Sequence, residues 1–205
     1  GMCLGDGSLT RRKSGKHKGQ LRFQMRGHIT DDRDHYDHFV KPLIDEIISP
    51  IPITTYVGNT PYYGVSTEQI GICHYLKKLG VPVGVKQNIQ IPSWILTNKF
   101  YSMAFIRGFV DTEGSIYAAK DSKGQHTRIR ISIVNTSALV IKQISNILKE
   151  LGVNNIIVKP YKGKSTINKI QIADSNVEIY FILIGSNNPK HTTKYQIWKA
   201  TGVNT

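Results

Sequence analysis

The chain has 205 residues and carries 27 Lys and Arg against 14 Asp and Glu, a formal charge of +13 at pH 7. Both parts are basic, since residues 1–97 hold 12 basic and 8 acidic side chains and residues 98–205 hold 15 and 6. This excess favours a polyanionic partner. Two cysteines without a CxxC pair exclude a disulfide framework. No apolar run is long enough to span a membrane, so we expect an intracellular protein with neither signal peptide nor transmembrane segment.

Two stretches of similar sequence, residues 1–8 and 104–115, lie 107 residues apart, which is about half of the chain. Each is an apolar run that ends in an acid, a glycine and a serine. A repeat at this spacing predicts two structurally similar halves. The aligned pairs are Gly1 with Gly108, Asp6 with Glu113, Gly7 with Gly114, and Ser8 with Ser115.

The repeat predicts two helices that end at Gly7 and Gly114, and we expect the given sequence to lack the first turns of the first one. Small residues four apart on each helix would let the two backbones approach closely. Asp6 and Glu113 would then meet at two helix C-termini, where partial negative charge collects. A divalent cation offsets this repulsion, so the pair predicts a metal-dependent phosphoryl-transfer centre. Two ordinary buried helices with glycine caps are the alternative.

The run Phe109-Val110-Asp111-Thr112-Glu113-Gly114 resembles the LAGLIDADG motif, with Glu in place of the final Asp. The run Met2-Cys3-Leu4-Gly5-Asp6-Gly7 resembles the same motif without its N-terminal turn. The chain is thus similar to single-chain, two-motif homing endonucleases. The resemblance implies an α+β fold of two pseudo-symmetric αββαββα halves, residues 1–97 (with a linker over 81–97) and 98–205. The motif helices would pack at the interface, and the antiparallel sheets would form a DNA-binding saddle.

The resemblance also implies a set of site residues. Asp6 and Glu113 would be catalytic and would bind the metal together with Gly5 and Thr112. We expect Mg²⁺, and Mn²⁺ or Ca²⁺ can occupy the same site.

In this family a lysine commonly precedes an Ile-Pro element before the second motif, and Lys86 before Ile91-Pro92 matches that pattern. Such a lysine stabilises charge on the phosphate or helps to activate water; a surface linker lysine is the alternative. Lys194 stands at the equivalent distance in the second half, and Lys190 is close enough to be confused with it.

Two stretches, residues 20–26 and 126–133, alternate between apolar and polar side chains, which is typical of half-buried strands. Arg and Gln can form bidentate contacts with guanine and adenine, so we expect the polar faces to contact DNA; a solvated sheet face is the alternative. Arg22 and Arg128 lie at similar distances after the two acids, which suggests equivalent positions. The expected DNA-binding residues are Arg11, Arg12, Lys13, Gln20, Arg22, Gln24 and Arg26, and His126, Arg128, Arg130, Ser132, Lys169 and Gln171.

Three further patterns are less specific. Ser66-Thr67-Glu68-Gln69 reads as a capping box that opens a helix. The acids and histidines between Asp34 and His38 could suggest a metal site, but we interpret them as an exposed helix face. Residues 162–164 form a basic turn between two expected strands.

We therefore predict a site-specific homing endonuclease, a monomer with internal pseudo-two-fold symmetry. It would make a double-strand break in a long asymmetric DNA target by Mg²⁺-dependent hydrolysis, and the resemblance implies short 3′ overhangs. An intron RNA maturase of the same fold and a non-cleaving DNA-binding regulator are the alternatives. Both would bind with strong salt dependence, so Mg²⁺-dependent linearisation of DNA, rather than binding, separates them from a nuclease.

Overall fold

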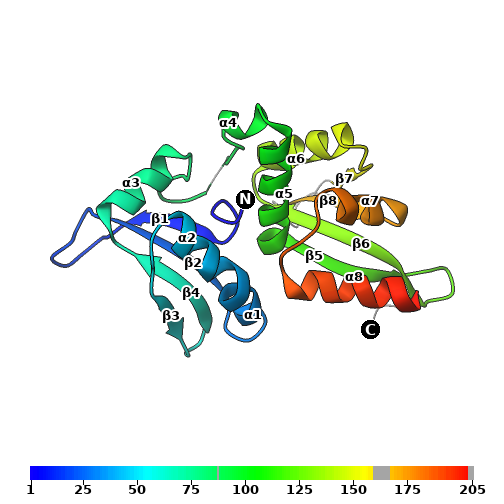
Figure 1. Cartoon of the computed structure of the whole chain (residues 1–205), viewed down its shortest axis with the longest axis horizontal. Coiled ribbons are helices and arrows are strands. Elements are labelled where there is room, and N and C mark those ends of the chain that lie inside the picture. The colour runs from blue at the N-terminus through cyan, green and yellow to red at the C-terminus, as the bar shows by residue number, and fades with distance from the viewer. Residues whose placement is uncertain (87, 159–166, 203–205) are drawn as a thin grey trace. The chain divides into compact units, whose positions relative to one another are not determined.

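The computed structural model describes residues 1–86, 88–158 and 167–202. The chain divides into two compact units, Met2–Lys86 and Gly1 with Gln87–Thr205. Each unit holds one four-stranded antiparallel sheet, ordered β1-β2-β4-β3 in the first and β5-β6-β8-β7 in the second (Figure 1). The shared strand order confirms the predicted repeat of two α+β halves.

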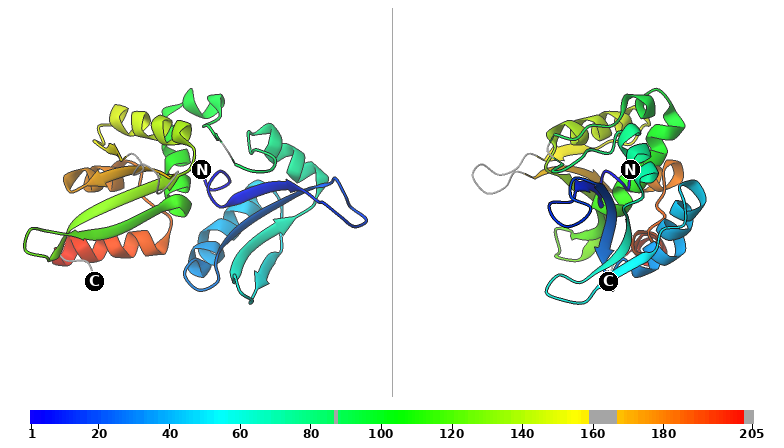
Figure 2. Two further views of the ribbon diagram at one scale, coloured as in Figure 1. Left: turned by 180° about the vertical axis from the view of Figure 1, so that it is seen from behind. Right: turned by 90° about the vertical axis from the view of Figure 1, so that its left-hand side faces the viewer.

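In the first unit the inward face of the sheet and the helices form one apolar core. Leu21, Phe23 and Met25 of β2 are buried there, as their alternation predicts, together with Tyr36 and Cys73. The β1–β2 connection projects beyond the sheet (Figures 1 and 2). The strands are β1 (Gly7–Arg11), β2 (Leu21–His28), β3 (Ile53–Tyr56) and β4 (Tyr62–Thr67), and the helices are α1 (Arg33–His35), the π-helical turn η1 (Tyr36–Val40), α2 (Lys41–Ile47) and α3 (Ile70–Lys78).

In the second unit helices α5 to α8 contact the sheet, whose β6 buries Ile129, Ile131 and Ile133 completely. The segment before α5 is fastened to α6, because the Gln143 side chain accepts the Ile91 N–H at 2.9 Å and Ser137 Oγ donates to the Ile89 carbonyl at 2.7 Å. The elements are α4 (Ser93–Leu96), α5 (Lys99–Glu113), β5 (Gly114–Lys120), β6 (His126–Asn135), α6 (Ala138–Glu150), β7 (Ile156–Val158), β8 (Asn168–Ala173), α7 (Ser175–Leu183) and α8 (Pro189–Thr201).

The two copies of the motif differ in conformation. The second forms the end of α5, as predicted, whereas residues 2–6 form turns, so the helix predicted for the first copy is not observed. The first copy contains Gly1, Gly5 and Gly7, and glycine is a poor helix former. Both motif glycines still permit the same sharp entry into a strand. A Cβ on Gly7 would lie 2.5 Å from the Cys3 carbonyl oxygen, and one on Gly114 would lie 2.4 Å from that of Val110.

The sheet register identifies equivalent residues in the two units. Ser8 pairs with Gln24, and Ser115 pairs with Ser132. Paired residues are therefore 16 apart in the first hairpin and 17 apart in the second. Because of this extra residue Arg22 corresponds to Arg130, so our interpretation of Arg128 as its equivalent was wrong.

The capping box predicted at Ser66 is also wrong. Ser66 and Thr67 are the last residues of β4, where they pair with Gln24 and Phe23 of β2. Helix α3 begins only at Ile70. Ser66 and Thr67 therefore pair within the sheet, although their side chains could equally well cap a helix.

No helix in the described part of the chain is long and apolar enough to cross a bilayer.

Candidate active site and nucleic-acid interface

Asp6 lies in the turn directly before β1 and is half-buried. It lines an open hollow of about 720 Å³ together with Arg26, His28, Asp32 and Tyr62. Tyr36 is buried close by, and its hydroxyl has no hydrogen-bond partner among the described residues. Burial, with the nearby charges of Asp6 and Asp32, raises the pKa of Tyr36 well above its ordinary value, which keeps the phenol neutral.

Lys86 lies beside the same turn. Its Nζ donates to the Leu4 carbonyl at 3.0 Å and also to the Gly5 carbonyl. The backbone before Lys86 is held next to β1, because Val83 forms a parallel bridge with Leu9 and the Gly84 N–H donates to the Leu9 carbonyl at 2.8 Å. The lysine predicted from the linker pattern is therefore held at the residue that precedes Asp6.

In the second unit Glu113 is the last residue of α5 and is half-buried. Thr112 turns its hydroxyl back along the helix, where Oγ1 donates to the carbonyls of Gly108 at 3.3 Å and Phe109 at 3.1 Å. The backbone carbonyl of Thr112 is thus the group that this residue could offer to a metal.

Asp111, which sequence reasoning did not assign a role, is the centre of a buried hydrogen-bond network. Its side chain is fully buried and accepts the Ser186 hydroxyl at 2.5 Å and the Asn187 N–H at 3.1 Å. Asn188 Nδ2 donates to the Asp111 carbonyl at 2.9 Å and its Oδ1 caps α8 by accepting the Lys190 N–H at 3.0 Å. The carboxylate therefore fastens the start of α8 to the last turn of α5.

This network helps to choose between Lys190 and Lys194, which the sequence alone did not distinguish as the lysine of the second half. Lys190 follows Asn188 by two residues, in the first turn of α8, whereas Lys194 lies one helical turn further on; both side chains are exposed. Four residues advance an α-helix by about 6 Å. Of the two, Lys190 is the one whose backbone is held near the end of the motif helix.

Replacing Asp111 by Asn tests the network. Asn would place an amide donor against the hydroxyl and N–H that the carboxylate accepts, and we expect the free energy of unfolding to fall by about 1–3 kcal/mol. Urea denaturation measures this loss. The matched control is Asp121→Asn in the exposed β5–β6 turn, where Asp121 accepts N–H groups of Lys123 and Gln125; an equal loss in both variants would contradict a special role for Asp111.

The outward face of the first sheet carries three of the predicted DNA-binding residues, and the hairpin beside it carries four more. Arg22 Nε donates to Ser66 Oγ at 3.1 Å, and Gln24 Nε2 donates to the same atom at 3.3 Å. The Arg26 guanidinium lies 4.0 Å from the centre of the Tyr62 ring. Arg11 and Lys13 are exposed at the hairpin end, and Arg11 donates to the Gly19 carbonyl.

The outward face of the second sheet repeats this arrangement with different residues. Arg130 is half-buried and its Nε has no hydrogen-bond partner among the described residues. Gln171 Nε2 donates to the Tyr117 hydroxyl at 3.4 Å, and Lys169 lies over the same ring. Ser132 is buried, and His126 contacts the Ala118 carbonyl at the strand end. The predicted basic turn at residues 162–164 lies outside the described residues.

Comparison with known proteins agrees with this architecture. Residues 100–187 match the family model described as a LAGLIDADG-like domain. The chain has the LAGLIDADG fold. The homing endonuclease I-DmoI aligns over 90% of both chains with 21% identity and a TM-score of 0.62. I-DmoI in complex with DNA and Ca aligns over 95% of this chain and 93% of that one, at 20% identity and a TM-score of 0.65. The meganuclease I-SmaMI bound to uncleavable DNA aligns over 98% of this chain and 88% of that one, at 13% identity and a TM-score of 0.63. No curated protein sequence matches the chain.

The donor atoms around Asp6 and Glu113 fit a hard divalent cation. Each unit offers one carboxylate and a neighbouring backbone carbonyl, and oxygen donors are what Mg²⁺, Mn²⁺ and Ca²⁺ prefer. In the first unit the Gly5 carbonyl already faces a cation, the ammonium of Lys86. The described residues contain no cluster of three or more His, Cys, Asp or Glu side chains that could hold a metal. An ion there would thus keep positions open for water and phosphate oxygens.

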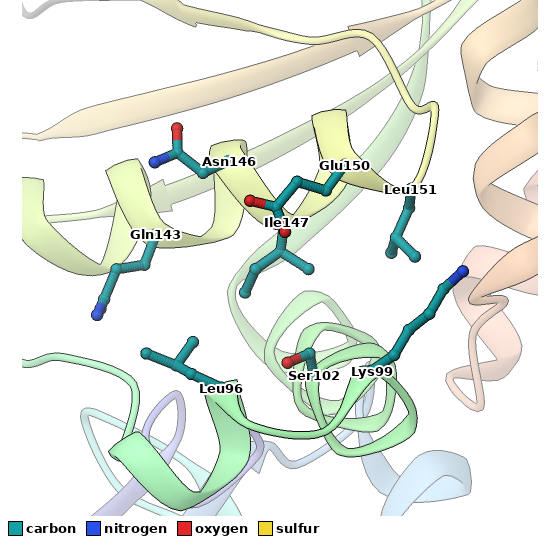
Figure 3. Close-up of a pocket in the computed structure, with 8 residues that line it drawn as sticks. All are labelled: Leu96, Lys99, Ser102, Gln143, Asn146, Ile147, Glu150 and Leu151. Carbon is teal, nitrogen blue, oxygen red and sulfur yellow. The ribbon is translucent and has the colours of Figure 1, made fainter.

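Two other features stand apart from the predicted site residues. The side chains between Asp34 and His38 form no such cluster: Asp37 accepts the Tyr63 hydroxyl, and His35 is buried against Phe39. Figure 3 shows a hollow of about 430 Å³ between α6 and the start of α5, lined by Lys99, Gln143 and Glu150 among others. It contains none of the predicted site residues.

Proposed function

We propose that this chain is a site-specific DNA endonuclease that makes a double-strand break by Mg²⁺-dependent hydrolysis and acts as a monomer. One observation carries the proposal. In each unit an acid stands directly before the first strand of a sheet whose outward face carries arginine with glutamine or serine. The LAGLIDADG fold supports it, because structures of I-DmoI and I-SmaMI, which share this fold, contain DNA.

The chain would supply three kinds of group to this reaction. Asp6 and Glu113, with the carbonyls of Gly5 and Thr112, would hold the divalent ions. A bound ion supplies charge neutralisation at the phosphate and activation of the attacking water. The outward arginine and glutamine side chains contact base edges, and the surrounding lysines contact phosphates.

A lysine in each unit would stabilise the charge that develops on the phosphate. Lys86 fits this role in the first unit because its ammonium is held at the residue before Asp6. For the second unit we infer that Lys190, rather than the predicted Lys194, has this role. The support is the Asp111 network, which fixes the first turn of α8 at the end of α5.

Selection of cleaved sites from a random plasmid library tests the function. We expect the chain to linearise a subset of plasmids in Mg²⁺ and none in EDTA, because the two carboxylates need a cation to act on a phosphodiester. DNA binding without cleavage in both Mg²⁺ and Mn²⁺ would contradict the proposal and favour the DNA-binding regulator. Selective binding of a structured RNA over duplex DNA would favour the maturase.

A further inference from the structure

Two acids occupy the same kind of place in the two units, at the junction between the fourth strand of the sheet and the next helix. Glu68 lies between β4 and α3, and Asp174 lies between β8 and α7. Side chains at such junctions usually cap the helix. Asp174 is the N-cap residue of α7 but makes no capping hydrogen bond, and α3 is preceded by Gln69 instead. The carboxylate of Glu68 instead accepts hydrogen bonds from Arg12, and that of Asp174 accepts them from Arg128.

Glu68 restrains three of the residues predicted to contact DNA. Its two carboxylate oxygens accept from Arg12 Nη1 at 2.7 and 2.9 Å, and Arg22 Nε lies 3.8 Å from Oε1. Gln20 Nε2 donates to the Glu68 backbone carbonyl at 2.9 Å. The Glu68 carboxylate therefore restrains the two arginines and offsets part of their charge, while its backbone carbonyl holds Gln20.

Asp174 does the same to Arg128, from an unusual backbone conformation. Its Oδ2 accepts from Arg128 Nη2 at 2.7 Å and its Oδ1 from Nε at 3.4 Å. This contact raises the pKa of the Arg128 guanidinium. Asp174 has φ +54° and ψ −127°, a region that favours glycine. Asp174 occupies a position where glycine would be less strained. This strain suggests that its negative charge has a function.

We propose that Glu68 and Asp174 are specificity-determining residues that suppress non-specific DNA binding. A paired arginine can approach a backbone phosphate only if it leaves its acid or brings the carboxylate toward the phosphate, and both cost free energy. A guanine edge that meets the restrained guanidinium carries no full negative charge and avoids this cost. The pairs would therefore weaken binding to arbitrary duplex more than binding to the target. This inference rests on the proposed DNA-binding function.

The test is the salt dependence of binding to a duplex of arbitrary sequence between 50 and 200 mM salt, measured by fluorescence anisotropy. We expect Glu68→Gln and Asp174→Asn to steepen the slope of log K against log salt by about 0.9 for each arginine released. Binding at low salt should tighten by about three- to tenfold. The matched control is Glu178→Gln, which removes the same charge and releases Lys199, 3.2 Å away on α8; it should leave the slope unchanged.

Two further variants separate charge from folding. Asp174→Gly removes the carboxylate while suiting the backbone, so it should melt no lower than wild type and still show the steeper slope. Adding Arg12→Gln to Glu68→Gln should bring the slope back toward wild type. Unchanged slopes in the two acid variants, or an equal change in Glu178→Gln, would overturn the inference alone. A wild-type chain that binds no duplex at 50 mM salt would overturn the proposed function as well.

Discussion

The double variant Asp6→Asn, Glu113→Gln is expected to lose DNA cleavage by at least about a hundredfold while it still binds its target. Both changes keep the shape of the side chain and remove the negative charge that would hold a cation and orient the attacking water. The assay is the rate at which a plasmid with a selected target is linearised in Mg²⁺, with anisotropy as the check on binding. Each single variant should accumulate nicked circles, because we expect each acid to serve the cleavage of one strand.

The matched control for this pair is Glu150→Gln. Glu150 is an exposed carboxylate at the end of α6, beside the hollow in Figure 3 and apart from the predicted site residues. We expect it to cleave at the wild-type rate. Rapid linearisation by the double variant would reject Asp6 and Glu113 as the centre.

Substitution of a lysine that lies at a motif is expected to change the proposed double-strand cleavage into nicking of one strand. Lys86→Met removes the ammonium held at Gly5, and Lys190→Met removes an ammonium from the first turn of α8. We expect each change to slow the cleavage of one strand by about a hundredfold. Lys194→Met should linearise plasmid at the wild-type rate, because Lys194 lies one turn further along α8. Gel quantification of supercoiled, nicked and linear DNA distinguishes these outcomes.

The two lysines on α8 serve as each other's control, since both changes remove one charge from the same helix. Nicking by Lys194→Met with normal cleavage by Lys190→Met would contradict the role inferred from the Asp111 network. Equal slowing by both would indicate a general effect of charge on DNA binding.

Local patterns in the sequence were sufficient to predict the strands and their buried faces. The period-two alternation of β2 and β6 depends only on neighbouring residues, and Phe23 and Ile131 are fully buried as it predicts. Register depends on the length of a hairpin and on pairing with distant strands, which alternation does not encode. For this reason Arg22 was matched with Arg128 although the sheets match it with Arg130.

The site residues that belong to a sequence motif could be predicted. Those that depend on contacts between distant segments could not. Lys86 was found from the linker pattern, and the structure holds it at the carbonyls of Leu4 and Gly5. The role of Asp111 needed the fold, because its partners lie 75 to 77 residues away. An asparagine before a proline, Asn188-Pro189, is a helix-start signal that could have drawn attention to that loop. The meeting of Asp6 with Glu113 stays a prediction.

The fastening of residues 89–91 to α6 has a consequence for building hybrid nucleases. Since Ile89 and Ile91 are buried and bonded to Ser137 and Gln143, this strip belongs with the C-terminal module when modules are exchanged between relatives. A graft joined directly after Lys86 would carry its own strip and keep those partners. A graft joined at residue 98 would place residues 89–91 of the other protein against α6. Such a chimera should be less soluble and melt at a lower temperature.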